Sequence, residues 1–189
     1  MKNYKLILPI LAYLVLSTYA IHAQNKITPR DGYSVQIGTL VEMLEDLKSR
    51  ITRSVRNLNQ EQTDFLLDDN ANTIGALIFH LAATEKYYQV YTFENRGYNS
   101  KEIKIWQTPM NLGEIARKEL IDKPIDHYLT IWTNVRKETL RLLKTKDDAW
   151  LTKKTSRGSM NNHWAWYHVM EHQANHMGQI QMLRKRMPN

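Results

Sequence analysis

The chain has 189 residues, of which 42% are hydrophobic and 24% charged, and this size and balance predict a single globular domain. It contains no cysteine, which excludes disulfides, thiolate ligands and a cysteine nucleophile, so a metal ion would have to be bound by His, Asp or Glu. The formal net charge is +7, but acidic residues flank two of the three basic segments. This pattern indicates solvated helix faces and argues against nucleic acid as a partner.

The N-terminal segment, residues 1–23, has the pattern of a secretory signal peptide. Lys2 and Lys5 precede an uncharged apolar run that is shorter than the roughly twenty residues of a membrane-spanning helix. Cleavage is expected before Gln24. The residue three positions before this cut is Ile21 rather than a small residue, which leaves an uncleaved membrane anchor as the alternative. We therefore expect an exported protein, periplasmic or extracellular, that contacts a membrane only if the segment is uncleaved.

Residues 24–189 contain four amphipathic stretches in which apolar residues recur mostly at intervals of three and four. Asn72 or Thr73 can cap the second helix, and Asn161 or Asn162 can cap the fourth. The expected helices cover residues 33–58, 73–95, 124–144 and 161–187.

The segments between these helices are expected to be connections. Residues 59–72 and 144–162 are rich in polar and turn-forming residues. The longer middle segment, residues 106–122, is expected to contain a short helix at most, because Pro109 and Gly113 interrupt it. No alternating strand pattern of useful length occurs, so the sequence predicts an all-α four-helix bundle.

Histidines are concentrated at the last expected helix. Side chains four residues apart lie on nearly the same helix face, about 6 Å apart, so His172 and His176 can bind one ion. His168 is rotated by about 80° from His176, and a third ligand should therefore come from a facing helix. Four of the seven histidines lie in or beside this helix: His163, His168, His172 and His176.

His80 is the candidate for that third ligand, because it falls among apolar residues of the second expected helix and should point into the bundle. A buried imidazole needs a partner. Two interpretations remain open at this point. Either His80 bonds to a carbonyl group while the last helix carries a partly exposed ridge of histidines, or the two helices assemble a metal site in the bundle core.

The segments "TIGALIFHLAATEKYY" and "WYHVMEHQANHMGQIQMLRKRM" resemble the DinB-like family of metal-binding four-helix bundles. Members carry a histidine in the second helix and an H-x3-H motif that ends in H-x-G-Q in the last. The resemblance implies that His80, His172 and His176 bind one divalent metal ion, with further coordination positions open. It implies zinc or nickel most often, and iron or manganese also fit because imidazoles select weakly among these metals.

Several neighbours of the expected ligands are candidates for supporting roles. Gln179 and His168 are expected beside the ligands, where a side-chain amide can orient an imidazole or bond between helices. Glu171, Glu85 and His168 are candidates for a general base. However, Glu171 lies about 100° from His172 around its helix, and Glu85 about 140° from His80. For both carboxylates we therefore expect a position at the surface or a contact to a ligand side chain, rather than a contact to the ion's water.

Two further features near the last helix have interpretations in packing and in binding. Gly178 is expected to have a packing reason, because a glycine within a helix costs about 1 kcal/mol relative to alanine. An aromatic cluster at the start of the helix can form the mouth of a pocket, although core packing explains part of it. The cluster consists of His163, Trp164, Trp166 and Tyr167.

Three functions remain after this reasoning. The first is an exported hydrolase in which a metal-activated water attacks the substrate. The second, suggested by relatives of the same fold, is a thiol-dependent S-transferase or isomerase, which the expected export disfavours because such thiols are mainly cytosolic. The third is a non-catalytic protein that binds a metal or small ligand. The expected partners are a small-molecule substrate or ligand and a second copy of the chain, without nucleic acid.

Overall fold

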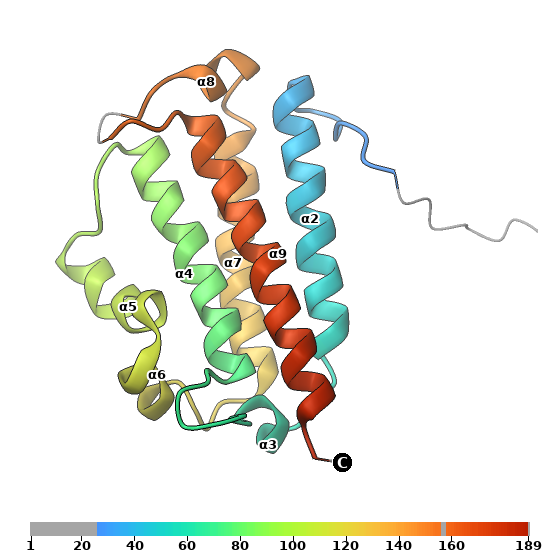
Figure 1. Ribbon diagram of the computed structural model, residues 1–189. Coiled ribbons are helices and arrows are strands. Elements are labelled where there is room, and N and C mark those ends of the chain that lie inside the picture. The colour runs from blue at the N-terminus through green and yellow to red at the C-terminus, as the bar shows by residue number, and fades with distance from the viewer. Residues whose placement is uncertain (1–25, 156–157, 189) are drawn as a thin grey trace, which may run out of the picture.

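The computed structural model describes residues 26–155 and 158–188, which form eight helices and an isolated β-bridge between Lys154 and Asn161. Four long helices lie side by side as a bundle, and four short helices lie at its ends and on one flank (Figure 1). The predicted signal peptide, residues 1–23, lies outside the described residues and stays a prediction. The long helices are α2 (Val35–Val55), α4 (Ile74–Phe93), α7 (Ile125–Leu143) and α9 (Asn162–Arg186), and the short ones are α3 (Gln60–Thr63), α5 (Ser100–Asn111), α6 (Gly113–Glu119) and α8 (Asp148–Thr152).

The helix α4 is the central element of the bundle. It packs against α7 on one side and α9 on another, while α5 covers part of its remaining surface. Its buried residues therefore lie all around the helix rather than along one stripe. The helix α2 completes the bundle by packing against α9 and α7. Among the described residues no helix has the length and apolarity needed to cross a membrane.

The two helices that face each other across the functional site begin at capping residues that the sequence predicts. The Thr73 hydroxyl accepts a bond from the backbone N–H of Ala76 at 3.0 Å, and the Asn161 amide oxygen accepts one from Trp164 at 2.8 Å. These bonds satisfy N–H groups that have no partner within the helix. The first residues of α4 and α9 are thus determined locally.

The middle segment differs from the expectation of a short helix at most. It forms twelve-residue α5 and seven-residue α6. Asn99 and Glu102 form a capping box that starts α5 before the segment considered in the sequence, and Pro109 is tolerated in the last turn of α5. The backbone then turns at Leu112, which has a φ of 54°. This turn leaves the last carbonyl groups of α5, including that of Pro109, available to partners outside the helix.

The other two expected connections also contain short helices. Asn59 forms a capping box with Gln62 at the start of α3, and the Asp147 carboxylate accepts a bond from the backbone N–H of Trp150 at the start of α8. Both helices are shorter than two turns, too short for a hydrophobic period to reveal them. Their N-terminal capping residues are the sequence feature from which these helices could have been predicted.

Candidate metal centre

Three histidines meet between the facing helices α4 and α9. His80 comes from α4, and His172 and His176 come from α9, where they lie one turn apart. One nitrogen of each ring lies within 4.8 Å of the other two. The Nε2 atom of His172 is 3.1 Å from Nε2 of His80 and 3.2 Å from Nε2 of His176. We call these three residues the histidine triad.

For two of the three rings, the partner of the second nitrogen shows that the nitrogen facing the centre carries a lone pair. Nδ1 of His80 lies 2.8 Å from the carbonyl oxygen of Pro109; since a carbonyl only accepts, this Nδ1 carries the proton and Nε2 of the neutral ring does not. Nδ1 of His176 donates in the same way to Oε1 of Gln179 at 2.8 Å. Nδ1 of His172 is buried and has no hydrogen-bond partner within the described residues.

Burial keeps the three imidazoles neutral. It lowers the pKa of His80 to about 4, although the bond to Pro109 acts in the opposite direction. It lowers the pKa of His172 to about 3, and the neighbouring His176 and His80 lower it further. Burial also lowers the pKa of His176. Neutral imidazole is the form in which histidine binds a metal ion.

This set of donors fits the divalent ion that the family resemblance implies. The unprotonated Nε2 atoms of His80 and His176 both face Nε2 of His172, and a single N–H there could satisfy only one of them, so the arrangement suits a shared cation. Bonds from Nδ1 to a carbonyl and to an amide orient two of the rings, as is common for metal-binding histidines. Three protein ligands leave a position open, which is typical of catalytic rather than structural zinc sites.

Gln179 and Gly178 follow the triad on α9. The structure supports the role expected for Gln179 but not the one expected for Gly178. Gln179 bonds His176 within the same helix and so orients a ring of the triad. The packing reason expected for Gly178 is wrong, because a Cβ atom at this exposed position would meet nothing within 4 Å. A close approach occurs instead at Gly75 on α4, where a Cβ atom would lie 2.5 Å from the ring of Tyr128.

His168 lies one turn before His172 and is not a member of the triad. Its Nδ1 is 3.0 Å from Oε1 of Glu171, and its ring stacks on Trp164 with a centroid distance of 5.2 Å. The Glu171 side chain is 45% exposed, and hydrogen bonds from Tyr167 and His168 lower its pKa. Glu171 is therefore a surface carboxylate with partners of its own, which weakens it as a general base.

Glu85 is neither a surface residue nor a neighbour of the triad, so the role expected for it is wrong. It is fully buried between α4 and α7. Its two oxygens accept hydrogen bonds from Trp132, Arg136, Thr139 and Gln173 at distances from 2.6 to 3.3 Å. Burial alone raises the pKa of Glu85, but the Arg136 guanidinium and these hydrogen bonds outweigh burial and lower it. A carboxylate with all these donors has no free lone pair for a substrate proton.

Arg136 and Gln173 complete this buried cluster, and sequence reasoning missed both. Arg136 is 2% exposed, and besides Glu85 it binds the backbone oxygen of Leu44, the carboxylate of Glu45 and the amide oxygen of Gln173. A weak signal existed, since Arg136 follows the buried Trp132 by four residues and therefore shares its helix face. We call Glu85, Arg136, Trp132, Thr139 and Gln173 the core polar network.

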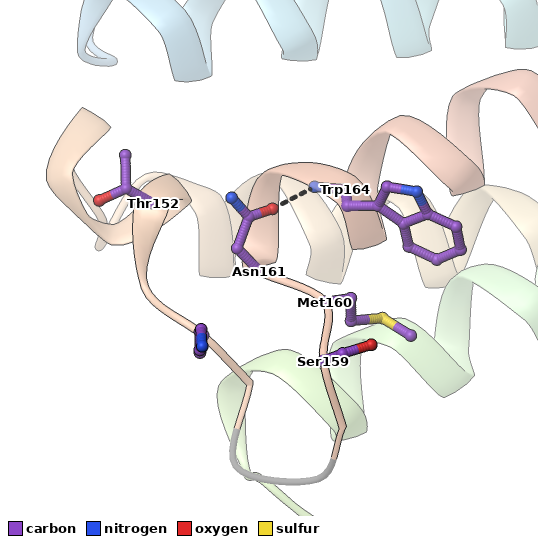
Figure 2. Close-up of a pocket in the computed structure, with 6 residues that line it drawn as sticks. Thr152, Ser159, Met160, Asn161 and Trp164 are labelled. Carbon is purple, nitrogen blue, oxygen red and sulfur yellow. Dashed lines mark hydrogen bonds between the residues drawn. The ribbon is translucent and has the colours of Figure 1, made fainter.

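The aromatic cluster at the start of α9 divides between core and surface. Trp166 is fully buried, whereas Trp164 and Tyr167 are each 46% exposed. Trp164 borders an open surface hollow of about 580 Å³ next to the α8–α9 connection (Figure 2). Tyr167 is not among the described residues that line this hollow. The hollow is lined by Thr152, Lys154, Ser159, Met160, Asn161 and Trp164.

A solved structure supports the fold. The crystal structure of the colibactin self-resistance protein ClbS in complex with double-stranded DNA resembles this chain with a TM-score of 0.60 and 10% sequence identity. The similarity covers 80% of this chain and 97% of that chain. At this identity it establishes the helical fold alone. The charge pattern predicts that nucleic acid is not a partner. The ClbS complex contradicts this exclusion, because a protein of this fold binds double-stranded DNA.

The family is established by the sequence itself. A comparison with curated proteins finds no match. The sequence model of the mycothiol S-transferase family, however, matches residues 39–188, which include all of α4 and α9 and hence the whole histidine triad. The chain therefore belongs to the mycothiol S-transferase family, a member of the DinB-like group of helical proteins.

Proposed function

We propose that this protein is a metal-dependent thiol S-transferase, in which His80, His172 and His176 bind one divalent ion. The family match over residues 39–188 carries the proposal. The convergence of three neutral imidazoles supports the ion. Zinc or nickel is the expected ion, and iron or manganese is compatible with the same ligands.

The chemistry follows from an open coordination position. A divalent ion held by the triad would lower the pKa of a thiol bound at the open position, so that a thiolate would be present at neutral pH. The chain orients the site through Pro109 and Gln179, which fix the rings of His80 and His176. In the transfer, the sulfur forms a bond to an electrophilic carbon of the second substrate, the leaving group departs with its electron pair, and the thiol proton passes to solvent.

Thiol transfer replaces hydrolysis as the first candidate. The expected export favours hydrolysis, whereas the family match supports a thiol transferase and gives hydrolysis no support. The surroundings of the candidate bases agree with this preference for thiol transfer over hydrolysis. A hydrolase of this kind needs a base for its water, but Glu85 is saturated by donors, and the other two candidates, Glu171 and His168, are hydrogen-bonded to each other. With a divalent ion held by His80, His172 and His176, a coordinating thiol would need no such base.

The test combines metal analysis with a transfer assay. The full chain is purified without chelator, and metal per chain is measured by plasma mass spectrometry together with thiol transfer to 1-chloro-2,4-dinitrobenzene. We expect about one ion per chain and transfer that depends on it. His172→Ala should lose both, because removing a ligand costs more than the roughly 10–100-fold in affinity that removing an outer partner costs.

His168→Ala is the matched control, since it removes an imidazole one turn away on the same helix and should keep the ion. Equal metal content in wild type and His172→Ala would contradict the site. A loaded protein that transfers no thiol would contradict the enzyme and leave a metal-binding protein.

A further inference from the structure

The surface hollow and the histidine triad lie on one continuous strip of α9. Trp164, at the edge of the hollow, stacks on His168 with an interplanar angle of 8° and a centroid distance of 5.2 Å. The His168 ring in turn lies 5.8 Å from that of His172. Trp164 and His168 both remain partly exposed. A ligand can therefore lie along these rings from the triad to the hollow without entering the core.

The helix sets the length of such a ligand. Trp164 and His172 are eight residues apart on α9, and the rise of about 1.5 Å per residue separates them by about 12 Å along the axis. A small thiol bound through sulfur at the triad would not reach the hollow. An extended thiol with its sulfur at one end and a headgroup at the other would fill both places.

The lining of the hollow selects the chemistry of the headgroup. Among the described residues that line it, the polar side chains are those of Thr152, Lys154, Ser159 and Asn161, and none is a carboxylate. Asn161 uses its amide oxygen to cap α9, as Figure 2 shows, so its NH₂ group is what it offers to a ligand. The Thr152 hydroxyl donates to the carbonyl of Ala149, so the hollow offers donors from Lys154, Ser159 and Asn161 beside one exposed aromatic ring.

The walls of the hollow are held in place by the backbone. The N–H of Asn162 bonds to the carbonyl of Lys153 at 3.0 Å, and the N–H of Thr155 bonds to the carbonyl of Met160 at 3.0 Å. The Asn162 side chain also donates to the carbonyl of Trp150. These bonds join the two chain segments that carry the lining residues, so the hollow is formed before any ligand binds.

We propose that this hollow is the headgroup subsite of the thiol substrate, and that the protein selects extended thiols whose headgroup carries several acceptor oxygens. The proposal rests on the proposed function, because the triad is taken to bind the sulfur. Two sources share this headgroup chemistry: the hydroxyl groups of a polyol, as in mycothiol, and the carboxylates of a peptide, as in glutathione. Lys154, the one cation among the described residues that line the hollow, distinguishes them.

Binding to the zinc-loaded full chain by titration calorimetry tests the subsite without requiring turnover. The probes are mycothiol, glutathione and the short thiol N-acetylcysteine. We expect at least one of the two extended thiols to bind about tenfold or more tightly than N-acetylcysteine. Trp164→Ala should remove about tenfold of that affinity and leave N-acetylcysteine unchanged, a difference typical of one lost aromatic contact.

Tyr167→Ala is the matched control, because this aromatic is equally exposed on the same helix but does not line the hollow. It should change no affinity. Lys154→Met should weaken glutathione selectively if the headgroup is recognised as a carboxylate, and leave mycothiol unchanged if it is recognised as a polyol. Metal content, measured for each variant, shows that the triad is intact.

The outcomes separate this inference from the proposed function. Equal affinities for the extended and short thiols, or an unchanged preference in both Trp164→Ala and Lys154→Met, would overturn the subsite while thiol binding at the metal stands. If none of the thiols binds to the loaded protein, the proposed function fails and the subsite fails with it.

Discussion

Two polar clusters in the bundle use neighbouring residues of the same helices and yet differ in kind. On α4, His80 belongs to the histidine triad and Glu85 to the core polar network, while on α9 the two clusters take the adjacent residues His172 and Gln173. The network is saturated, because each oxygen of Glu85 and each guanidinium nitrogen of Arg136 has a partner. The triad is not, since its Nε2 atoms face one another.

The difference between the clusters indicates which one has a function. A buried charge is retained when its partners satisfy it, and the network then contributes to a unique core. In the triad, the lone pairs of His80 and His176 both face His172, which can donate a proton to only one of them, and this imbalance points to an exogenous cation. Changes in the network should therefore affect folding, and changes in the triad should affect metal and thiol.

The largest expected effect on stability is that of Arg136→Met. The substitution keeps most of the side-chain volume but leaves the Glu85 carboxylate buried without its cation. Breaking a buried pair in this way costs about 3–5 kcal/mol of unfolding free energy. Urea denaturation of the metal-free protein measures it. Arg141→Met on the same helix is the control, because its pair with Glu138 is exposed and its loss should change the unfolding free energy little. Equal losses of unfolding free energy in the two variants would contradict the proposed difference between the buried and the exposed ion pair.

Acid should act on the same network. The folded-state pKa of Glu85 lies below its ordinary value of 4.5, so its contribution to stability is complete above pH 4.5 and is lost as pH falls through the folded-state pKa. We expect unfolding free energy to fall less steeply between pH 5 and 3 in Glu85→Gln than in wild type. Glu114→Gln, at an exposed position, serves as the control and should keep the wild-type slope. Identical slopes in all three proteins would show that Glu85 does not stay ionised.

A smaller effect is expected at the edge of the triad. Gln179→Leu removes the acceptor that orients His176 and should lower metal affinity about 10–100-fold without unfolding the protein. Competition with a chromogenic chelator gives the affinity. Gln181→Leu makes the same change two residues along α9, away from the triad, and should not affect the affinity. Loss of stability rather than affinity would mean that Gln179 serves the fold.

The smallest expected effect has the opposite sign. Gly178→Ala should raise the unfolding free energy by about 0.5–1 kcal/mol, because alanine favours the helix and its Cβ atom meets no neighbour. Thermal unfolding of the metal-free protein at low concentration measures this gain, and metal affinity should stay at the wild-type level. A destabilised variant would indicate that another chain or segment packs closely against this exposed face.

Local patterns made much of this protein predictable. The intervals of apolar residues predicted the four long helices, and Thr73 and Asn161 marked where α4 and α9 begin. The triad was also within reach, because a four-residue interval places His172 and His176 on one face and the apolar neighbours of His80 turn it inward. The short helices were not predicted because they lack a full hydrophobic period, although the capping boxes at Asn59 and Asn99 indicate where two of them begin.

The sequence by itself thus determined the all-helical bundle, the order of its long helices and the histidines that converge between α4 and α9. Periodicity and capping act over a few residues, and the printed sequence contains them in full. Only the tertiary structure decided that Glu85 is saturated by Arg136, that the carbonyl of Pro109 orients His80, and that a donor-rich hollow lies along α9 from the triad. Each of these depends on atoms brought together from distant segments, and no local pattern records which partners a folded chain places side by side.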